Sequence, residues 1–273
     1  MTGKNQPDFK ALLSFAHELA DTSATAIRPH FRKSISVTNK ASPGEFDPVT
    51  AADTAAERAI RKAIDMRWPD HGVIGEEYAH TREGARYRWV IDPIDGTRAF
   101  IKRSPEFTIN IGLIEEHRPV FGIIYVPALE QLYATLGPDE AVEVSIAPDA
   151  QVQSLADCQA TPLKGRDPDP HALIAFASRS HASETTEAFL QRLPIAEKRK
   201  ASSSLKFCLI AKGEADLYAR LGQTSEWDTA AGHAILAAAG GSVTTVDGAP
   251  LRYGKTDGRF ANPHFIAWAR QSL

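Results

Sequence analysis

The stretch of sequence that decides the fold of this chain reads Asp92-Pro93-Ile94-Asp95-Gly96-Thr97. It follows an apolar run at positions 87–91, which predicts a buried strand that ends in two acids. Two carboxylates about 4 Å apart repel by roughly 4 kcal/mol at an effective dielectric constant of about 20, so a cation between them removes a large cost. Oxygen ligands favour Mg²⁺, Mn²⁺ or Ca²⁺ over zinc. The stretch therefore predicts a hard divalent cation at a strand end.

The last two residues of the stretch predict an anion beside that cation. Gly96 and Thr97 can turn the backbone so that N–H groups at the start of a following helix face an anion. A metal next to a phosphate group is the chemistry that this combination favours.

Composition limits the class of protein. The chain has 273 residues, 43% of them hydrophobic and 24% charged, which is ordinary for a globular protein of one large or two moderate domains. The net charge is −3 and there is no long basic run, so we expect no binding of nucleic acid polymers through counterion release. A small phosphorylated molecule stays compatible with this charge, because bound metal ions reverse the local field.

The cysteines and the N-terminus indicate where the protein works. Cys158 and Cys208 are the only cysteines and neither lies in a CxxC pair, which predicts no disulfide framework and a reducing, cytoplasmic setting. Residues 1–10 are polar, so we expect no signal peptide and no stable membrane insertion.

Hydrophobic periodicity in the first half predicts two helices and a run of strands. Residues 9–31 and 50–66 have helical spacing, and the second segment opens with the capping-box pattern of Thr50 and Asp53. Short strands are expected at 35–38 and 73–74. The segments 107–114, 120–126 and 131–135 then predict an antiparallel meander.

The second half alternates between helix and strand patterns, which indicates a layered α/β arrangement. We expect strands at 172–177, 216–219 and 242–246, and helices at 183–191, 203–212 and 226–239. The region 147–170 has mixed polarity and no clear period. We therefore predict an N-terminal α+β domain over 1–147, with most of the metal ligands, and a C-terminal α/β domain over 148–273, with the substrate-recognition segments.

Three further acids stand at the ends of expected elements. Asp47 lies in a loop before a helix, Glu76 follows a short strand, and Asp228 opens the helix at 226–239. Taken singly, each has an ordinary structural explanation as a turn or N-cap residue.

Four segments together resemble the ordered motifs of the inositol monophosphatase superfamily, a group of Mg²⁺-dependent, lithium-sensitive phosphatases. They are Asp47-Pro48-Val49-Thr50 with Asp53, Gly75-Glu76-Glu77, residues 92–97, and Trp227-Asp228-Thr229-Ala230-Ala231-Gly232. The resemblance implies a layered αβαβα sandwich of the inositol monophosphatase / fructose-1,6-bisphosphatase type. It also implies metal ligation by the side chains of Glu76, Asp92, Asp95 and Asp228 and by the Ile94 carbonyl.

The same resemblance implies a mechanism. Two or three Mg²⁺ ions would share the carboxylates, and a metal-activated water would attack phosphorus directly. Thr97 and Glu76 would orient or deprotonate that water, and Asp47 would support it as a third catalytic residue. The N–H groups of Gly96 and Thr97 would hold the phosphate.

The second half carries the signal for the substrate. Residues 178–181, 203–208 and 213–220 resemble the nucleotide-binding segments of 3'(2'),5'-bisphosphate nucleotidases, the branch tied to sulfate assimilation. This implies removal of the 3'-phosphate of adenosine 3',5'-bisphosphate to leave AMP. Lys206 and Arg220 would anchor the second phosphate, and His181 would contact the base or ribose. The implied substrate contacts are Asp95, Gly96, Thr97, His181, Ser203, Lys206, Arg220 and Asp228.

Other functions stay open. Residues 71–77 and 98–100 resemble the histidinol-phosphatase branch of the same superfamily, so histidinol phosphate and inositol monophosphate are alternative substrates. A non-enzymatic module that binds metal or phosphate is a further alternative. Dimers are common in the superfamily, and a homodimer is therefore among the expected assemblies.

Overall fold

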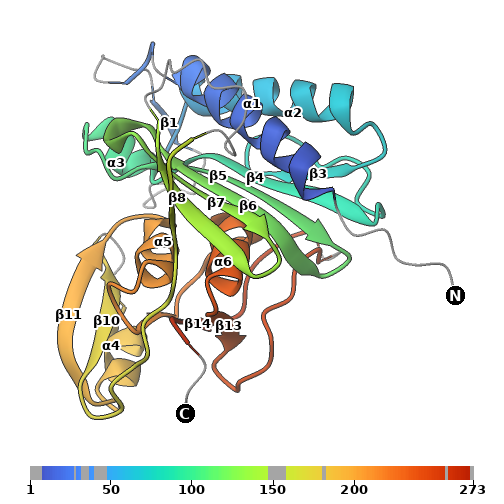
Figure 1. Ribbon diagram of the computed structural model, residues 1–273. Helices are drawn as coiled ribbons and strands as arrows, with labels where there is room; N and C mark the ends of the chain where they lie inside the picture. Colours follow the sequence, from blue (N-terminus) through green and yellow to red (C-terminus); the bar gives the residue numbers. More distant parts are fainter. Residues whose placement is uncertain are drawn as a thin grey trace, which may run out of the picture.

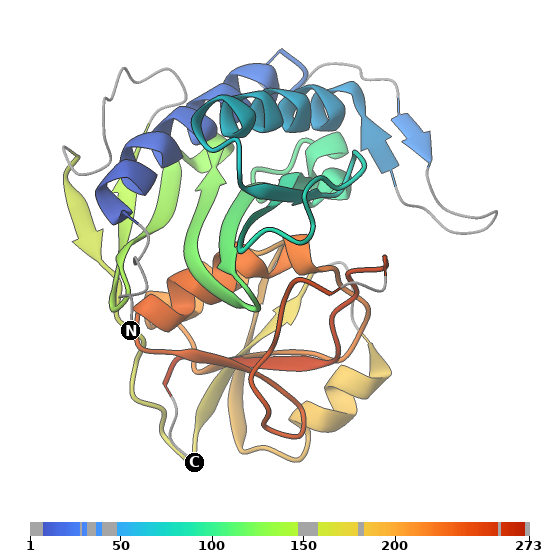
Figure 2. The same ribbon diagram turned by 90° about the vertical axis from the view of Figure 1, so that its right-hand side faces the viewer.

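The protein folds into five alternating layers, seen from two sides in Figures 1 and 2. The computed structural model describes residues 8–27, 29–31, 37–39, 48–146, 158–179, 183–255 and 258–270. Helices α1 (Phe9–Ile27) and α2 (Ala51–Arg67) cover the outer face of a seven-stranded sheet. Helices α5 (Leu205–Ala211) and α6 (Ala230–Ala238) lie between this sheet and a five-stranded one. Helix α4 (Glu184–Leu190) packs on the far side, which confirms the predicted αβαβα sandwich.

The seven-stranded sheet has the order β3-β4-β5-β6-β7-β8-β9. The bounds are β3 Gly72–Gly75, β4 Tyr87–Asp95, β5 Thr108–Glu115, β6 Arg118–Val126, β7 Gln131–Gly137, β8 Glu140–Ser145 and β9 Ala160–Pro162. Only β3 and β4 pair in parallel, and β4 to β9 form an antiparallel meander. The alternation of apolar residues and turns predicted β5, β6 and β7 of this meander but not β8 and β9. Because β9 follows residue 147 and still pairs with β8, the division of the chain at that residue stays a prediction.

The five-stranded sheet has the order β11-β10-β12-β14-β13. The bounds are β10 Leu173–Ser178, β11 Ile195–Ala201, β12 Leu217–Arg220, β13 Ser242–Thr245 and β14 Phe265–Trp268. Two strands of this sheet, β11 and β14, were not predicted from the sequence. The residues of β11 are mostly charged, in keeping with its place at the edge of the sheet. A small hairpin of β1 (Val37–Asn39) and β2 (Pro48–Thr50) precedes α2. No helix in the described ranges has both the length and the apolar character needed to span a membrane.

The backbone of helix α6 packs directly against the seven-stranded sheet. Gly112 of β5 and Gly122 of β6 are directly paired, and both face the first turn of the helix. A Cβ atom on Gly122 would lie 2.3 Å from the backbone oxygen of Ala231, and one on Gly112 would lie 2.9 Å from its nitrogen. The paired glycines therefore let the helix backbone rest on the sheet. As a result, residues 226–228, just before α6, lie against β4 and β5.

Replacing Gly122 with alanine tests this contact. The added methyl group would meet backbone rather than a movable side chain, so α6 must shift. Overpacking of this kind costs roughly 1–3 kcal/mol, even though alanine in place of glycine would otherwise favour a strand. We expect urea denaturation to show that loss for Gly122→Ala. The control is Gly84→Ala, because no atom lies within 4 Å of a Cβ at Gly84. Equal stability of the two variants would contradict the contact.

Candidate active site

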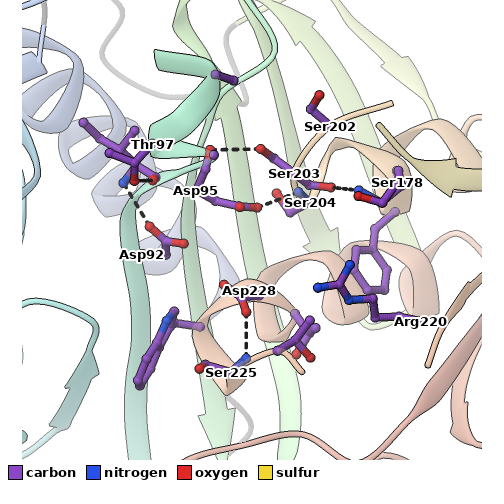
Figure 3. A pocket seen from close by; sticks show the side chains of 18 of the residues that line it. Asp92, Asp95, Thr97, Ser178, Ser202, Ser203, Ser204, Arg220, Ser225 and Asp228 are labelled. Carbon is purple, nitrogen blue, oxygen red and sulfur yellow. Dashed lines mark hydrogen bonds between the residues drawn. The ribbon is translucent and has the colours of Figure 1, made fainter. Parts of the chain in front are cut away.

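A cavity of about 510 Å³ opens where the end of β4, the starts of α3 (Thr97–Ile101) and α5, and the turn before α6 meet. Figure 3 shows its walls at close range. Both halves of the chain line it. The lining residues are Glu76, Asp92, Ile94, Asp95, Gly96, Thr97, Arg98, Ala99, Ser178, Ser202, Ser203, Ser204, Lys206, Phe207, Tyr218, Arg220, Gln223, Thr224, Ser225, Trp227, Asp228, Thr229 and Phe265.

Three carboxylates converge in this cavity. Asp92 and Asp95 come from β4 and Asp228 from the short 3₁₀ turn η3 (Glu226–Asp228), and one oxygen of each lies within 4.8 Å of the others. In Figure 3 the three side chains point into the same space. The predicted convergence of acids from distant parts of the sequence is therefore present in the fold.

A bulge in β4 explains why two acids three residues apart share one side. In a regular strand such residues point to opposite faces of the sheet. Here Asp92 pairs with Asn110 and Asp95 pairs with Thr108, so β4 carries one extra residue between the two pairs. Bulges re-aim side chains in this way. The irregular strand end thus turns both carboxylates toward the cavity.

Asp228 lies in a different local structure from the one predicted. The expected helix over 226–239 is broken, because η3 ends at Asp228 and α6 begins only at Ala230. Asp228 does not open the helix. It closes a capping box, in which the backbone N–H of Ser225 donates to Asp228 Oδ2 at 2.6 Å. This bond fixes the carboxylate at the edge of the cavity.

The electrostatics of the cluster favour a bound cation. Burial raises the pKa of Asp92 well above its ordinary value, and the nearby carboxylates of Glu76, Asp95 and Asp228 raise it further. Burial, and then the charge of Asp95, raises the pKa of Asp228 to about 7. Carboxylate oxygens are the ligands that Mg²⁺ and Ca²⁺ prefer. The donor set and the mutual repulsion therefore both fit a hard divalent cation.

Thr97 has a carboxylate partner that the sequence analysis did not assign. Its hydroxyl donates to the Ile94 carbonyl at 3.1 Å and lies 3.4 Å from Asp53 Oδ1. Asp53 is buried, and its other oxygen accepts the backbone N–H of Thr50 at 2.8 Å. The sequence showed Asp53 only as a capping residue, since its contact with Thr97 depends on the tertiary fold. Asp47 lies outside the described residues.

The two serines just before α5 donate hydrogen bonds to Asp95. Ser204 N–H donates to Asp95 Oδ2 at 2.6 Å, and Ser203 Oγ donates to the Asp95 carbonyl at 3.0 Å. Gly96 has a φ of 87°, and a Cβ there would lie 2.3 Å from Ser203 Oγ. Glycine is therefore required at this position for two reasons, its left-handed backbone and the close approach of Ser203.

Two cations, Lys206 and Arg220, line a further part of the cavity, which we call the cationic wall, as distinct from the acidic wall of Asp92, Asp95 and Asp228. The Lys206 ammonium is buried, donates to the Ser203 carbonyl at 2.5 Å and lies 4.8 Å from the centre of the Tyr218 ring. Burial lowers the pKa of Lys206 to about 8, against an opposing effect of Asp95. Arg220 donates to the Gln223 carbonyl at 2.9 Å, and its guanidinium faces the acids in Figure 3.

The remaining predicted residues are distributed as follows. Glu76 and Gly96 line the cavity, and Glu76 lies at the end of β3 near Asp92 but outside the tightest group of three acids. His181 is outside the described residues. Ser202 and Thr224 also line the cavity, and no pattern in the sequence singled them out. Arg98 lines it as well, and the sequence showed it only within the segment that resembles the histidinol-phosphatase branch.

Comparison with known proteins agrees with this geometry. The family model described as "Inositol monophosphatase family" matches residues 8–272. The 3'(2'),5'-bisphosphate nucleotidase CysQ of Escherichia coli K12 is 40% identical over 228 residues, which cover 82% of this chain and 86% of that protein. The protein of the same name from Salmonella typhimurium LT2 is 41% identical over 222 residues, covering 80% of this chain and 84% of that one.

Solved structures give the same result. The crystal structure of CysQ from Bacteroides thetaiotaomicron, a bacterial member of the inositol monophosphatase family, has a TM-score of 0.80 and 34% identity, covering 98% of this chain and 100% of that one. An inositol monophosphatase from Zymomonas mobilis has a TM-score of 0.75 and 29% identity, with coverage of 98% and 96%. Because the family model spans nearly the whole chain and the cavity carries the expected acids, this protein belongs to the inositol monophosphatase family.

Proposed function

We propose that this protein is a Mg²⁺-dependent phosphomonoesterase that hydrolyses the 3'-phosphate of adenosine 3',5'-bisphosphate to give AMP and phosphate. The observation that carries the proposal is one cavity that is lined both by three converging carboxylates and by the cations Lys206 and Arg220. The bacterial relatives that bear the name 3'(2'),5'-bisphosphate nucleotidase, at 40% identity over most of the chain, support the same substrate class.

The proposal assigns the cation to the acidic wall. Asp92, Asp95 and Asp228 would hold two to three Mg²⁺ ions, with Glu76 and the Ile94 carbonyl as further ligands. Bound Mg²⁺ supplies Lewis-acid polarisation of a phosphate ester and makes water a better nucleophile at neutral pH.

The residues beside the acids would position water and phosphate. Thr97 Oγ1 is held between the Ile94 carbonyl and Asp53, so its orientation is fixed before substrate arrives. A hydroxyl held in this way can accept a hydrogen bond from an attacking water, because its single proton is donated either to the Ile94 carbonyl or to Asp53 Oδ1. The backbone N–H groups of Gly96 and Thr97 would face the phosphate.

The cationic wall would bind the phosphate that is not cleaved. A bisphosphate needs a cationic anchor away from the acids, and charge-assisted hydrogen bonds from Lys206 and Arg220 would provide it. Ser203 supports this wall, because its carbonyl accepts from Lys206 and its hydroxyl donates to Asp95. Direct contacts of Ser203 and His181 with substrate stay predictions, as do a homodimer and a cytoplasmic location.

A panel of phosphate esters in Mg²⁺ buffer tests the proposal. We expect the highest kcat/KM with adenosine 3',5'-bisphosphate and lower values with inositol monophosphate and histidinol phosphate, since these monophosphates leave the cationic wall unused. Removing Mg²⁺ with EDTA should abolish phosphate release. Faster turnover of either monophosphate would support the alternative substrate, and release of no phosphate at all would support a binding module.

The cationic wall can be tested with a matched pair of substrates. Adenosine 3'-monophosphate keeps the cleaved phosphate and lacks the second one. For Arg220→Ala and Lys206→Met we expect kcat/KM for the bisphosphate to fall by about 10–100-fold, the value of a charge-assisted hydrogen bond of about 1.5–3 kcal/mol. The loss on the monophosphate should be much smaller.

The control for these variants is Lys198→Met. Lys198 lies on β11 outside the cavity and pairs with Glu187 on the surface. The Lys198→Met variant should hydrolyse both substrates with the same kcat/KM as the unaltered protein. If Arg220→Ala lowered kcat/KM equally for the two substrates, the cationic wall would not be the anchor for the second phosphate.

Asp92→Asn tests the acidic wall through stability. In EDTA the amide removes one of the repelling buried charges, so we expect the melting temperature to stay the same or rise. Saturating Mg²⁺ should stabilise the unaltered protein, by about 2.7 kcal/mol at a hundred times the Kd, and should stabilise the variant far less. An equal response of both proteins to Mg²⁺ in thermal denaturation would show that Asp92 is not a ligand.

A further inference from the structure

Glu57 is a fully buried carboxylate that does not line the cavity. It lies on α2, and three groups donate to it: the backbone N–H of Glu77 at 2.7 Å, the backbone N–H of Tyr78 at 3.2 Å and Arg61 Nε at 2.8 Å. A buried ion pair is weak support for stability, because desolvation offsets much of the attraction. A contribution to stability therefore does not explain why Glu57 and Arg61 are paired at this position.

The Glu57 carboxylate contacts the backbone on both sides of Glu76. A Cβ on Gly75 would lie 2.2 Å from Glu57 Oε1, so the carboxylate fits against the chain just before Glu76. The two backbone donors, Glu77 and Tyr78, follow just after it. Arg61 extends the same contact, since its Nη2 donates to the Tyr78 carbonyl at 3.1 Å. The turn that carries Glu76 is thus held against α2 at three residues around it, Gly75, Glu77 and Tyr78.

The same helix holds a second part of the site. Asp53 and Glu57 are four residues apart on α2 and therefore lie on one face of the helix. Asp53 meets Thr97, and Glu57 meets the turn of Glu76. A single helix therefore contacts two separate parts of the cavity wall, the start of α3 at Thr97 and the turn after β3 that carries Glu76.

We propose that Glu57, held by Arg61, is a positioning residue that fixes the Glu76 carboxylate beside Asp92 and thereby sets the affinity of the acidic wall for its divalent cation. The inference rests on the proposed metal site and adds residues to it that lie outside the cavity. Partners that orient metal ligands from behind change metal affinity by about 10–100-fold when they are replaced.

The test measures binding of Mn²⁺ alone by isothermal titration calorimetry, without substrate. In Glu57→Gln the amide keeps the size of the side chain, but its NH₂ group faces N–H donors and cannot accept from them. We expect the Kd for Mn²⁺ to rise by about 10–100-fold. The Mg²⁺ concentration for half-maximal turnover should rise in parallel, and KM for the bisphosphate at saturating Mg²⁺ should stay close to that of the unaltered protein.

The matched control is Asp216→Asn. Asp216 is also a fully buried carboxylate, accepts the backbone N–H of Ile174 at 2.7 Å and pairs with Arg166 at 3.1 Å, and it does not line the cavity. This variant should lose stability as Glu57→Gln does and keep its Mn²⁺ affinity. If Glu57→Gln and Asp216→Asn changed the Kd for Mn²⁺ equally, Glu57 would stabilise the fold in general and would not position Glu76.

Arg61→Lys is a second variant, and it tests the same role if Glu57→Gln does not fold. Lysine keeps the charge but lacks the planar fork that reaches both Glu57 and the Tyr78 carbonyl, so a smaller rise in the Kd for Mn²⁺ is expected. Unchanged Mn²⁺ affinity in the folded variants would overturn the inference. If the unaltered protein binds Mn²⁺ but does not hydrolyse the bisphosphate, the proposed function fails and the inference about Glu57 still stands on the binding data.

Discussion

The contact between the backbone of α6 and the paired glycines of the seven-stranded sheet is the constraint on which the site depends. Gly112 and Gly122 remove the side chains that would hold the helix away, and Ala231 lies directly above them. Because η3 leads straight into α6, this approach brings Asp228 to the end of β4. A helix held farther from the sheet would move Asp228 away from Asp92 and Asp95.

The site is held together by opposing electrostatic effects. Burial, and then repulsion from the neighbouring carboxylates, raises the pKa of Asp92. The fold offsets part of the cost of this acidic cluster with directed hydrogen-bond donors. The Ser204 N–H donates to the Asp95 carboxylate, and the Ser225 N–H donates to the Asp228 carboxylate. Hydrogen bonds to the charged form of a carboxylate stabilise it without neutralising it. The acids thus stay arranged as ligands, and a divalent cation completes the balance of charge.

The sequence predicted the parts of this structure that depend on local pattern. The periodic helices of the first half and the meander of β5 to β7 follow from alternation and turn residues. The role of Asp53 could not be predicted in this way, because its capping pattern is local and its contact with Thr97 is not. The break before α6 was missed for a similar reason, since the apolar spacing continues through it. The edge strand β11 has the composition of a surface loop, and only its pairing with β10 reveals it.

The most direct test of the central claim is an anomalous diffraction measurement on crystals of the protein soaked in Mn²⁺. The account predicts a Mn²⁺ peak within coordination distance of carboxylate oxygens of Asp92, Asp95 and Asp228 together, since these are the atoms that the α6 contact brings within 4.8 Å of one another. A fully soaked crystal with no peak between β4 and η3, or with Mn²⁺ bound only elsewhere on the protein, would contradict it.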